Sequence, residues 1–168
     1  MGFSRSNQEI QGIRAQKPVG DLTANDYVPL FFSKKTPMLC AIETAENSFS
    51  VPMVYISVKP EIIGEKGVYF SDGNIASNAT KKYCKLEELG KLDWDNIWGW
   101  NPGKIGFDEA KRIKSAEVLV PHMISPKWFT KMVVPDEESR AKLLGLPYHL
   151  PVEVNSEFYF TDRGKNAQ

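Results

Sequence analysis

A carboxylate at the head of an apolar run is the residue of this sequence best placed to do chemistry. Glu117 follows the basic stretch 111–114 and leads into Val118-Leu119-Val120. Strands of Val and Leu are usually buried on at least one face, and a buried carboxylate is costly unless it is paired or has a function. An acid on a rigid strand is therefore suited to an active site. The alternative, which the segment alone favours, is a structural carboxylate that reaches solvent or pairs with Lys111 or Arg112.

A second candidate site lies where a helix is predicted to begin. Thr36 is a good N-cap and Pro37 a good first helical residue. The free N–H groups at such a helix start attract anions, and Lys34 and Lys35 stand beside it, so a phosphate or pyrophosphate fits here. Tyr27, at the start of the preceding strand, can offer an aromatic face to a base or a nicotinamide ring. The alternative is a capped surface helix with two solvated lysines.

Other catalytic patterns are missing from the sequence. The two histidines lie in no Ser/His/Asp or Cys/His arrangement, and we find no Walker loop, GxGxxG or zinc spacing, so no metal is expected. Tryptophan side chains can stack on bases, although they are more often part of a core. The turn-rich segment 98–104, which contains Trp100, precedes the Glu117 strand and is a suitable place for a substrate-contacting loop.

Size and composition predict one domain. We expect it to span residues 1–162, followed by a flexible tail over 163–168. Lys plus Arg and Asp plus Glu both number 21, so a nucleic acid would be held by a local patch such as 111–114. The two cysteines have no metal-ligand spacing and no signal peptide precedes them, which predicts a reducing, cytoplasmic location. No apolar run approaches the roughly 18 residues of a membrane span, so no membrane association is expected.

Several elements must position these residues. Strands are predicted at 26–32, with Pro29 indicating an edge or a bulge, and at 51–58, 68–70 and 117–120. Further strands are predicted at 132–134, 152–154 and 157–160. Helices are predicted over 6–14, from 36 onward, over 86–94 and over 108–115, the last with acids first and bases last. The mixture without regular βαβ alternation is typical of an α+β fold.

The order of the motifs resembles a known family. The series consists of Asp26-Tyr27-Val28-Pro29 with Phe32, Thr36-Pro37-Met38-Leu39, Phe70-Ser71-Asp72-Gly73-Asn74, Leu89 to Trp94, Lys111-Arg112 with Ala116 to Val120, and Phe158-Tyr159-Phe160. It resembles the DarT family of DNA ADP-ribosyltransferase toxins over nearly the whole chain. The resemblance implies an ADP-ribosyltransferase-like fold of central antiparallel or mixed β-sheets flanked by short helices. It also implies NAD as the ADP-ribose donor, single-stranded DNA, with thymine as the base, as the target, and a macrodomain antitoxin as partner.

The resemblance assigns roles to residues of this sequence. Glu117 falls on the family's catalytic glutamate, which orients the nicotinamide ribose, stabilises the oxocarbenium-like transition state and helps to deprotonate the target base. An anionic carboxylate beside developing positive charge is electrostatic transition-state stabilisation. Tyr27, Lys35 and Thr36 match residues of the NAD site, and Lys35 takes the place of its arginine. Arg5 is also assigned to cofactor binding, and Lys35 with Glu117 to catalysis.

By position, Lys111, Arg112 and Trp100 are our candidates for DNA contact. We expect Glu117→Ala to abolish transfer and to leave the fold intact, because the sequence shows a lone strand carboxylate.

The sequence departs from the family pattern in two places. Lys35 keeps a positive charge but lacks the planar fork with which arginine grips pyrophosphate. Residues 2–6 resemble a stretch that, in the family, follows a strand with a His-x-Thr element, and that strand is absent from this sequence. The hypotheses left open are a fragment, a late start, or a catalytically impaired remnant acting only as a nucleic-acid-binding module. A transferase that acts on RNA or on another base is a further alternative.

Overall fold

The structure, a computed structural model, describes residues 8–44, 53–145, 147 and 150–160. It divides into two compact units. The first contains the chain up to Ser33 together with Ile63–Ile124, and the second contains Lys34–Ile62 together with the chain from Ser125. Each unit has its own small sheet, so the two are described separately. The extent of our predicted domain, 1–162, stays a prediction, and the proposed tail 163–168 lies outside the described residues.

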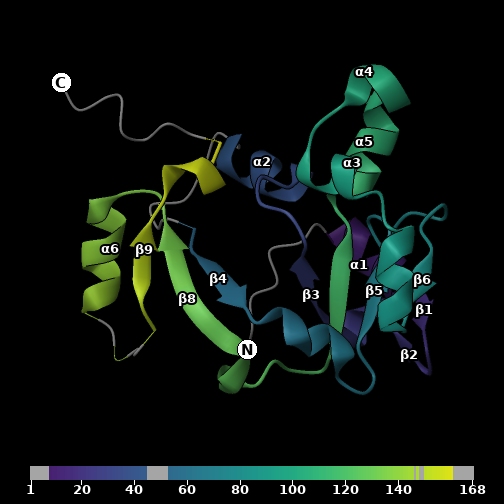
Figure 1. Ribbon diagram of the computed structural model, residues 1–168, viewed down its shortest axis with the longest axis horizontal. Coiled ribbons are helices and arrows are strands. Elements are labelled where there is room, and N and C mark those ends of the chain that lie inside the picture. The colour runs from purple at the N-terminus through teal and green to yellow at the C-terminus, as the bar shows by residue number, and fades with distance from the viewer. Residues whose placement is uncertain (1–7, 45–52, 146, 148–149, 161–168) are drawn as a thin grey trace. The chain divides into compact units, whose positions relative to one another are not determined.

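The first unit is built on a four-stranded antiparallel sheet in the order β3-β7-β5-β6 (Figure 1). Its strands are β3 (Tyr27–Phe31), β5 (Tyr69–Ser71), β6 (Lys82–Tyr83) and β7 (Glu117–Pro121). A short hairpin of β1 (Pro18–Val19) and β2 (Leu22–Thr23) accompanies it. Because β7 pairs with strands on both sides, its first four residues are buried. Pro29 lies in the edge strand β3, as predicted, since a central strand would need its missing N–H.

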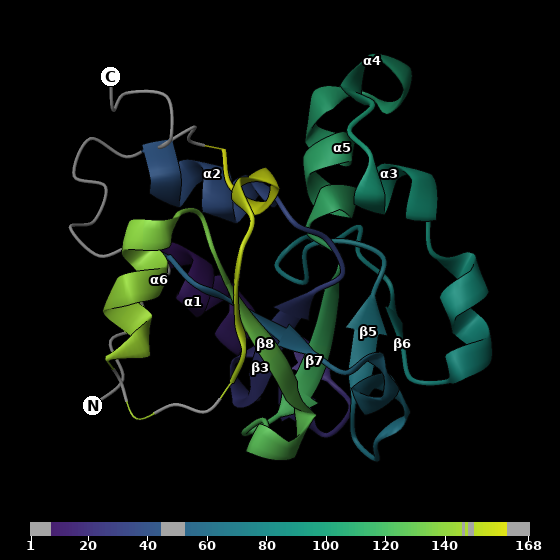
Figure 2. The ribbon, with the colours of Figure 1, turned by 60° about the vertical axis from the view of Figure 1, so that its left-hand side comes forward.

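Helices gather at one end of β7 in this unit. They are α3 (Trp94–Trp98), α4 (Pro102–Ile105) and α5 (Phe107–Lys114), and both ribbon views show them grouped there (Figures 1 and 2). Helix α5 has its acids first and its bases last, and only two residues separate it from β7. The predicted helix over 86–94 is instead a 3₁₀ helix, η3 (Leu86–Lys91), followed by α3. The Asp93 side chain accepts the Asn96 N–H and starts α3 at Trp94.

The remaining elements of this unit lie near the amino terminus. Helix α1 (Gln8–Ala15) agrees with the predicted helix, ends before Pro18 and has no buried residue. A 3₁₀ turn, η1 (Ala24–Asp26), precedes β3. A core cluster joins these segments to the sheet, and its buried members are Val19, Ala24, Tyr27, Ile75 and Leu119. The polar and poorly periodic amino-terminal segment thus contributes Val19 and Ala24 to the core that includes Leu119 of β7.

The second unit holds a three-stranded mixed sheet in the order β4-β8-β9. Strands β4 (Tyr55–Val58) and β8 (Phe129–Val134) are antiparallel, and β9 (Val152–Val154) runs parallel to β8. Helix α2 (Pro37–Thr44) begins where predicted, whereas α6 (Glu137–Leu144), capped by Asp136, was not predicted. The remaining 3₁₀ turns are η2 (Pro60–Gly64), which spans the boundary between the units, and η4 (Pro126–Trp128).

One predicted strand of the second unit is wrong. Residues 156–158 form a 3₁₀ turn, η5 (Ser156–Phe158), in place of the strand expected over 157–160. The Asn155 side chain accepts the Glu157 N–H and starts the turn. The antiparallel and mixed sheets of the described residues, with their short helices, nevertheless confirm the predicted α+β class. Among the residues that the structure describes, no helix is long and apolar enough to cross a membrane.

Candidate active site around Glu117

Glu117 is the buried acid of the first unit. The residue is 2% exposed, on the central strand β7. One carboxylate oxygen, Oε1, accepts the Ile75 N–H at 3.0 Å, and Oε2 accepts from Arg14 Nη1 at 3.0 Å. The predicted ion-pair partners Lys111 and Arg112 were therefore the wrong cations, because α5 directs them elsewhere. An ionised carboxylate has about four acceptor positions, so these two bonds leave room for another donor.

Arg14 reaches Glu117 from α1, 103 residues away in the sequence. Its Nη1 makes the ion pair, and its Nη2 donates to the Ala24 carbonyl at 3.0 Å. Our expectation that Glu117 is a lone carboxylate was wrong. Removing it would leave the Arg14 guanidinium and the Ile75 N–H without their acceptor, so Glu117→Ala is expected to cost about 1–3 kcal/mol of stability.

Burial and pairing act on the pKa of Glu117 in opposite directions. Burial raises the pKa, while the Arg14 charge and the hydrogen bonds from Ile75 and Arg14 lower it, and the pKa lies above the ordinary value. A raised pKa in a carboxylate with one specific charge partner is typical of functional sites, although structural ion pairs also show it. Arg14 therefore favours the ionised form of the acid, against the effect of burial.

Ser71 ties the backbone of Glu117 to the turn that follows β5. Its hydroxyl accepts the Glu117 N–H at 3.2 Å and lies 2.7 Å from the Gly73 carbonyl, to which it donates. The turn over 72–75 then brings the Ile75 N–H to the carboxylate. The Ser71-Asp72-Gly73-Asn74 turn signal in the sequence thus marks the loop that holds Glu117, although nothing local predicted the contact with Ile75.

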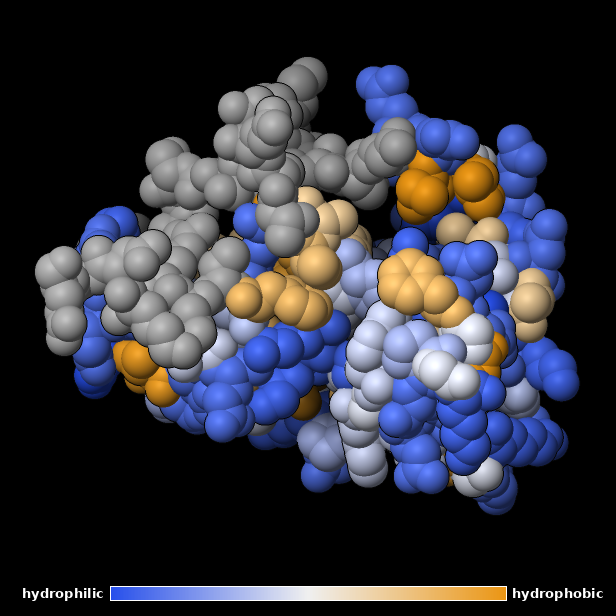
Figure 3. Space-filling model, turned by 90° about the horizontal axis from the view of Figure 1, so that it is seen from above, coloured by the Kyte–Doolittle hydropathy of each residue, from blue (hydrophilic) through white to orange (hydrophobic). Residues whose placement is uncertain are grey.

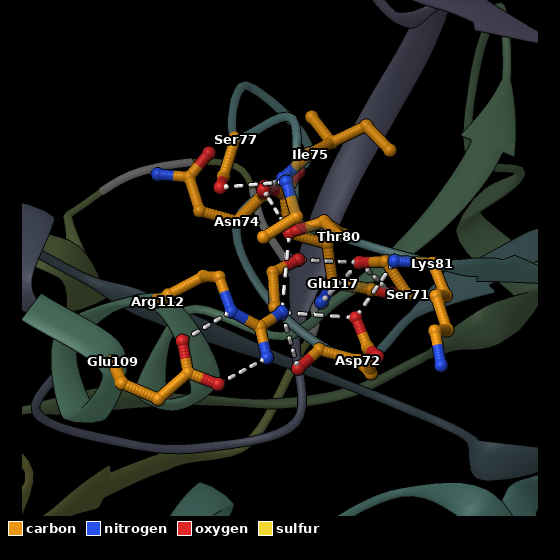
Figure 4. Close-up of polar contacts among 12 residues, drawn as sticks. Ser71, Asp72, Asn74, Ile75, Ser77, Thr80, Lys81, Glu109, Arg112 and Glu117 are labelled. Carbon is orange, nitrogen blue, oxygen red and sulfur yellow. Dashed lines mark hydrogen bonds and ion pairs between the residues drawn. The ribbon is translucent and has the colours of Figure 1, made fainter. Parts of the chain in front are cut away.

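Arg112 fastens the same turn from α5 (Figure 4). Its Nε and Nη2 donate to the two carboxylate oxygens of Glu109 at 2.8 and 2.7 Å. Its Nη1 lies 3.0 Å from Asp72 Oδ1 and within 3.3 Å of the Asp72 carbonyl and Thr80 Oγ1. The Asn74 N–H donates to the Arg112 carbonyl. The geometry gives Arg112 a structural task, and its predicted contact with DNA stays a prediction.

Tyr27 lies in the core of the first unit. It is 6% exposed, its hydroxyl donates to the Val19 carbonyl at 3.0 Å, and its ring meets Tyr69 edge-on. Burial raises the pKa of its hydroxyl. A contact between Tyr27 and a nicotinamide ring stays a prediction.

The predicted anion site belongs to the second unit. Thr36 Oγ1 accepts the Leu39 N–H at 3.3 Å, which confirms Thr36 as the N-cap of α2. Lys35 has a positive φ of 55°, which is uncommon for a residue with a side chain, and its N–H donates to the Tyr55 hydroxyl. Its Nζ lies 5.9 Å from the centre of the Phe160 ring. The Lys34 ammonium pairs with Glu157 at 3.2 Å, so only the cap is confirmed, and the role of Lys35 and Thr36 with a cofactor stays a prediction.

Exposed aromatic residues crowd the helices α3 to α5. Trp98, Phe107 and Trp100 are 66%, 61% and 46% exposed. The Trp100 and Phe107 rings meet edge-on at 5.7 Å, and Lys111 Nζ lies 5.6 Å from the centre of the Phe107 ring. Figure 3, which looks from the side to which α4 points, shows hydrophobic residues at the surface among hydrophilic ones on its right-hand side. Trp100 and Lys111 therefore share one surface, whereas Arg112 turns inward.

Two further predictions concern Arg5 and the binding of a metal ion. Arg5 lies outside the described residues. No group of three or more His, Cys, Asp or Glu side chains that could hold a metal ion occurs within the described ranges.

Solved structures define the class of this fold. The chain matches Thermus sp. 2.9 DarT in complex with ADP-ribosylated ssDNA with a TM-score of 0.81 at 22% identity, over 94% of this chain and 81% of that one. It matches the same protein in complex with NAD⁺ with a TM-score of 0.75 at 21% identity, over 88% and 81%. The fold is thus that of the DarT ADP-ribosyltransferases.

Sequence comparison gives the family. The family model for DarT, the ssDNA thymidine ADP-ribosyltransferases, matches residues 2–160, so this chain belongs to the DarT family of DNA ADP-ribosyltransferases. A DNA ADP-ribosyl transferase of Thermus aquaticus is 29% identical over 92% of this chain and 73% of its own length. A fusion of a DNA ADP-ribosyl transferase with a DNA ADP-ribosyl glycohydrolase, from Thermosipho africanus, is 26% identical over 80% of this chain and 35% of its own length.

Proposed function

We propose that this chain transfers ADP-ribose from NAD⁺ to thymine in single-stranded DNA, with residues 1–162 acting as one domain. The observation that carries the proposal is Glu117, a buried carboxylate on a central strand with acceptor positions to spare, in a DarT-family chain. The complexes of the Thermus protein with NAD⁺ and with ADP-ribosylated ssDNA support this choice of donor and target.

Glu117 has a defined part in such a reaction. NAD⁺ supplies ADP-ribose when the bond between its ribose and nicotinamide breaks, and a new bond to the base forms as the base loses a proton. A fixed carboxylate stabilises the positive charge that develops at the anomeric carbon and can accept a hydrogen bond from a ribose hydroxyl. Because β7, Ile75 and Arg14 already hold the carboxylate, little reorganisation is needed as that charge appears.

The donor would be held by the residues that the family pattern marks, namely Arg5, Tyr27, Lys35 and Thr36. The described part of this set supports the proposal at the start of α2, where the capped helix and the neighbouring Lys35 offer positive potential to a pyrophosphate, while Lys34 pairs with Glu157. We expect Lys35→Arg to tighten NAD⁺ binding, because a guanidinium can bind two phosphate oxygens at once. Isothermal titration calorimetry measures the affinity for NAD⁺. Unchanged or weaker binding would contradict a contact between Lys35 and the pyrophosphate.

The DNA would lie on the surface of α3 to α5. Aromatic rings that stack on bases, next to cations that attract the backbone, are the usual means of holding single strands. Trp100 and Lys111 share that surface, and Phe107 extends it. We expect Trp100→Ala to weaken binding of a fluorescent thymine-containing oligonucleotide about tenfold, from a stacking contribution of about 1–3 kcal/mol. Trp128→Ala, which alters a tryptophan outside these helices, is the control.

We further propose that the chain is a cytoplasmic toxin whose partner is a macrodomain antitoxin that removes the modification. The fused glycohydrolase of the Thermosipho africanus relative supports such a pairing. Expression of the chain should then stop bacterial growth, and co-expression of a macrodomain glycohydrolase should restore it. Glu117→Gln should be harmless in the same host.

The transfer itself is tested with labelled NAD⁺ and single strands that differ only in containing or lacking thymine. We expect label on the thymine strand alone, and about 100- to 1000-fold less with Glu117→Gln. Label on a strand without thymine would overturn the base assignment. Binding of DNA without any transfer would favour the alternative of a catalytically silent nucleic-acid-binding module.

A further inference from the structure

The turn that leads into α2 has a conformation that a residue with a long side chain seldom adopts. Lys35 lies in this turn with a positive φ of 55°. A side chain in this left-handed region costs free energy, so the conformation persists only where surrounding contacts hold it. Residues of this kind gather at active sites and ligand clamps. The second unit must therefore supply a contact that fixes the backbone of Lys35.

Tyr55, on strand β4, supplies that contact. Its hydroxyl accepts the Lys35 N–H at 3.2 Å and donates to the Phe158 carbonyl at 3.1 Å. A tyrosine hydroxyl has one proton to donate and lone pairs to accept with, and both capacities are used here. Burial raises the pKa of Tyr55 to about 12, against the lowering effect of the Lys35 N–H. The hydroxyl therefore keeps its proton, and with it the bond to Phe158, at neutral pH.

The Tyr55 side chain is itself held in place. Its backbone pairs with Val133 in the ladder between β4 and β8. The rings of Phe158 and Tyr159 meet its ring edge-on, at 5.3 and 5.4 Å between ring centres. The turn η5, which stands where a strand was predicted, thus brings both a carbonyl and a ring to Tyr55. A side chain locked by packing and by a hydrogen bond can hold a neighbouring segment in one geometry.

The two lysine side chains at this turn make weaker contacts. The Lys34 ammonium pairs with Glu157 at 3.2 Å, but the two side chains are 44% and 77% exposed, and such pairs contribute little. Lys35 Nζ lies 5.9 Å from the centre of the Phe160 ring, near the outer limit of a cation–π contact. The backbone of Lys35 is thus held more firmly than its ammonium, which can turn to meet a ligand.

We propose that Tyr55 is a positioning residue of the donor site, whose hydroxyl holds the backbone of Lys35 in the conformation that offers Lys35 and Thr36 to the pyrophosphate of NAD⁺. This inference rests on the proposed function, since it concerns the same pyrophosphate contact. Because Thr36 follows Lys35 directly and caps α2, a change in the backbone of Lys35 also moves the cap. One hydroxyl on β4 thereby governs two residues of the proposed site.

Tyr55→Phe tests the proposal, because it keeps the ring and its packing and removes only the hydroxyl. We expect the Kd for NAD⁺, measured by isothermal titration calorimetry, to rise about five- to tenfold, the factor that corresponds to the loss of one hydrogen bond. Single-turnover transfer at saturating NAD⁺ should stay within about twofold, because Tyr55 is proposed to act on binding. An unchanged Kd, or a loss of rate that saturating NAD⁺ does not restore, would overturn the proposal.

Tyr159→Phe is the matched control. Tyr159 is a buried tyrosine of the same unit, and its hydroxyl donates to the Val133 carbonyl at 2.6 Å instead of meeting Lys35. Urea denaturation should show a loss of stability in both variants, since each loses a buried hydroxyl contact. Only Tyr55→Phe should weaken the binding of NAD⁺. An equal rise in Kd for the two variants would reduce Tyr55 to a purely structural residue and overturn the proposal.

A second measurement needs no NAD⁺. Hydrogen exchange of the Lys35 N–H, followed by NMR, reports directly whether Tyr55 holds this backbone. We expect exchange at least tenfold faster in Tyr55→Phe than in Tyr159→Phe, and equal rates would overturn the proposal. If the unaltered chain does not bind NAD⁺, the proposed function fails, while this measurement still decides whether Tyr55 fixes Lys35.

Discussion

Two charge clusters hold the segment 71–80 of the first unit, and they differ in what they leave unused. At Glu117 one buried acid meets one guanidinium and one backbone N–H, which fills two of about four acceptor positions. At Arg112 one guanidinium faces two acids, a carbonyl and a hydroxyl, with contacts recorded on all three of its nitrogens. The carboxylate of the first cluster keeps acceptor positions that no protein donor among the described residues fills, whereas the guanidinium of the second has an acceptor at each of its three nitrogens.

This difference leads us to interpret Glu117 as a reactive group and Arg112 as a structural one. A cluster whose task is to hold the chain gains from satisfying every donor, because an unsatisfied buried group is costly. Glu117 instead keeps acceptor positions without a protein donor among the described residues, which suits the substrate contact that we propose for it. Arg112 would have to give up protein contacts to bind a phosphate. We therefore interpret Glu117 as the reactive group and Arg112 as its support.

The largest effect should come from Glu117→Gln. It keeps the shape of the side chain and one acceptor oxygen but loses the charge. We expect transfer to fall about 100- to 1000-fold, the usual loss when one preorganised electrostatic group is removed. Single-turnover transfer to a thymine-containing single strand measures it, with circular dichroism to show that the variant folds. Activity within tenfold of the unaltered chain would contradict the interpretation of Glu117 as the reactive group.

The next effect concerns stability. Arg112→Gln should lower the free energy of unfolding by about 2–3 kcal/mol, because Asp72 and Glu109 lose a charged donor. Urea denaturation measures the loss. Arg140→Gln, at a surface pair, should stay within about 0.5 kcal/mol. If Arg112→Gln were as mild as this control, the Arg112 cluster would not be a structural clamp.

A smaller loss is expected at Gly73, where the turn passes Arg112. A Cβ there would lie 2.4 Å from Arg112 Nη1 and 2.9 Å from the Arg112 carbonyl oxygen. Gly73→Ala should therefore cost about 1–2 kcal/mol in urea denaturation, since backbone must shift. Gly12→Ala in α1 meets nothing within 4 Å and should be neutral or slightly stabilising. Equal results for the two would show that the turn is not closely packed on Arg112.

The smallest effect is a pH dependence of stability. The pKa of Glu117 is raised in the folded chain. The stability that this carboxyl contributes is therefore fully present below its pKa in the unfolded chain, and it is lost as the pH rises through its pKa in the folded chain. The amide that Glu117→Gln introduces does not titrate. The free energy of unfolding of Glu117→Gln, relative to that of the unaltered chain, should thus rise with pH from about 4 through the range between the unfolded and the folded pKa of Glu117. Urea midpoints at several pH values test this, and a difference independent of pH would contradict the raised pKa.

Much of the local structure could be predicted from the sequence. Thr36-Pro37 marked the start of α2, Pro29 an edge strand, and the acid-to-base order of 108–114 a helix leading into β7. These signals act within a few residues, through capping, backbone geometry and the helix dipole. The same limitation explains two errors. The predicted helix over 86–94 is broken because the Asp93 side chain caps a new helix at Trp94. The predicted strand over 157–160 begins as a turn because the Asn155 side chain accepts the Glu157 N–H. In both cases a capping hydrogen bond outweighs weak propensities.

The sequence by itself determined that Glu117 is an acid on an apolar strand and that the motifs follow the DarT order. Only the tertiary structure decided what that acid meets. The contacts with Arg14 and Ile75 span 103 and 42 residues, whereas Arg112, on the helix just before β7, pairs with Asp72 and Glu109. Charge and spacing show which ions are present, but the partner of each is fixed when β7 is enclosed by its neighbours and water is excluded.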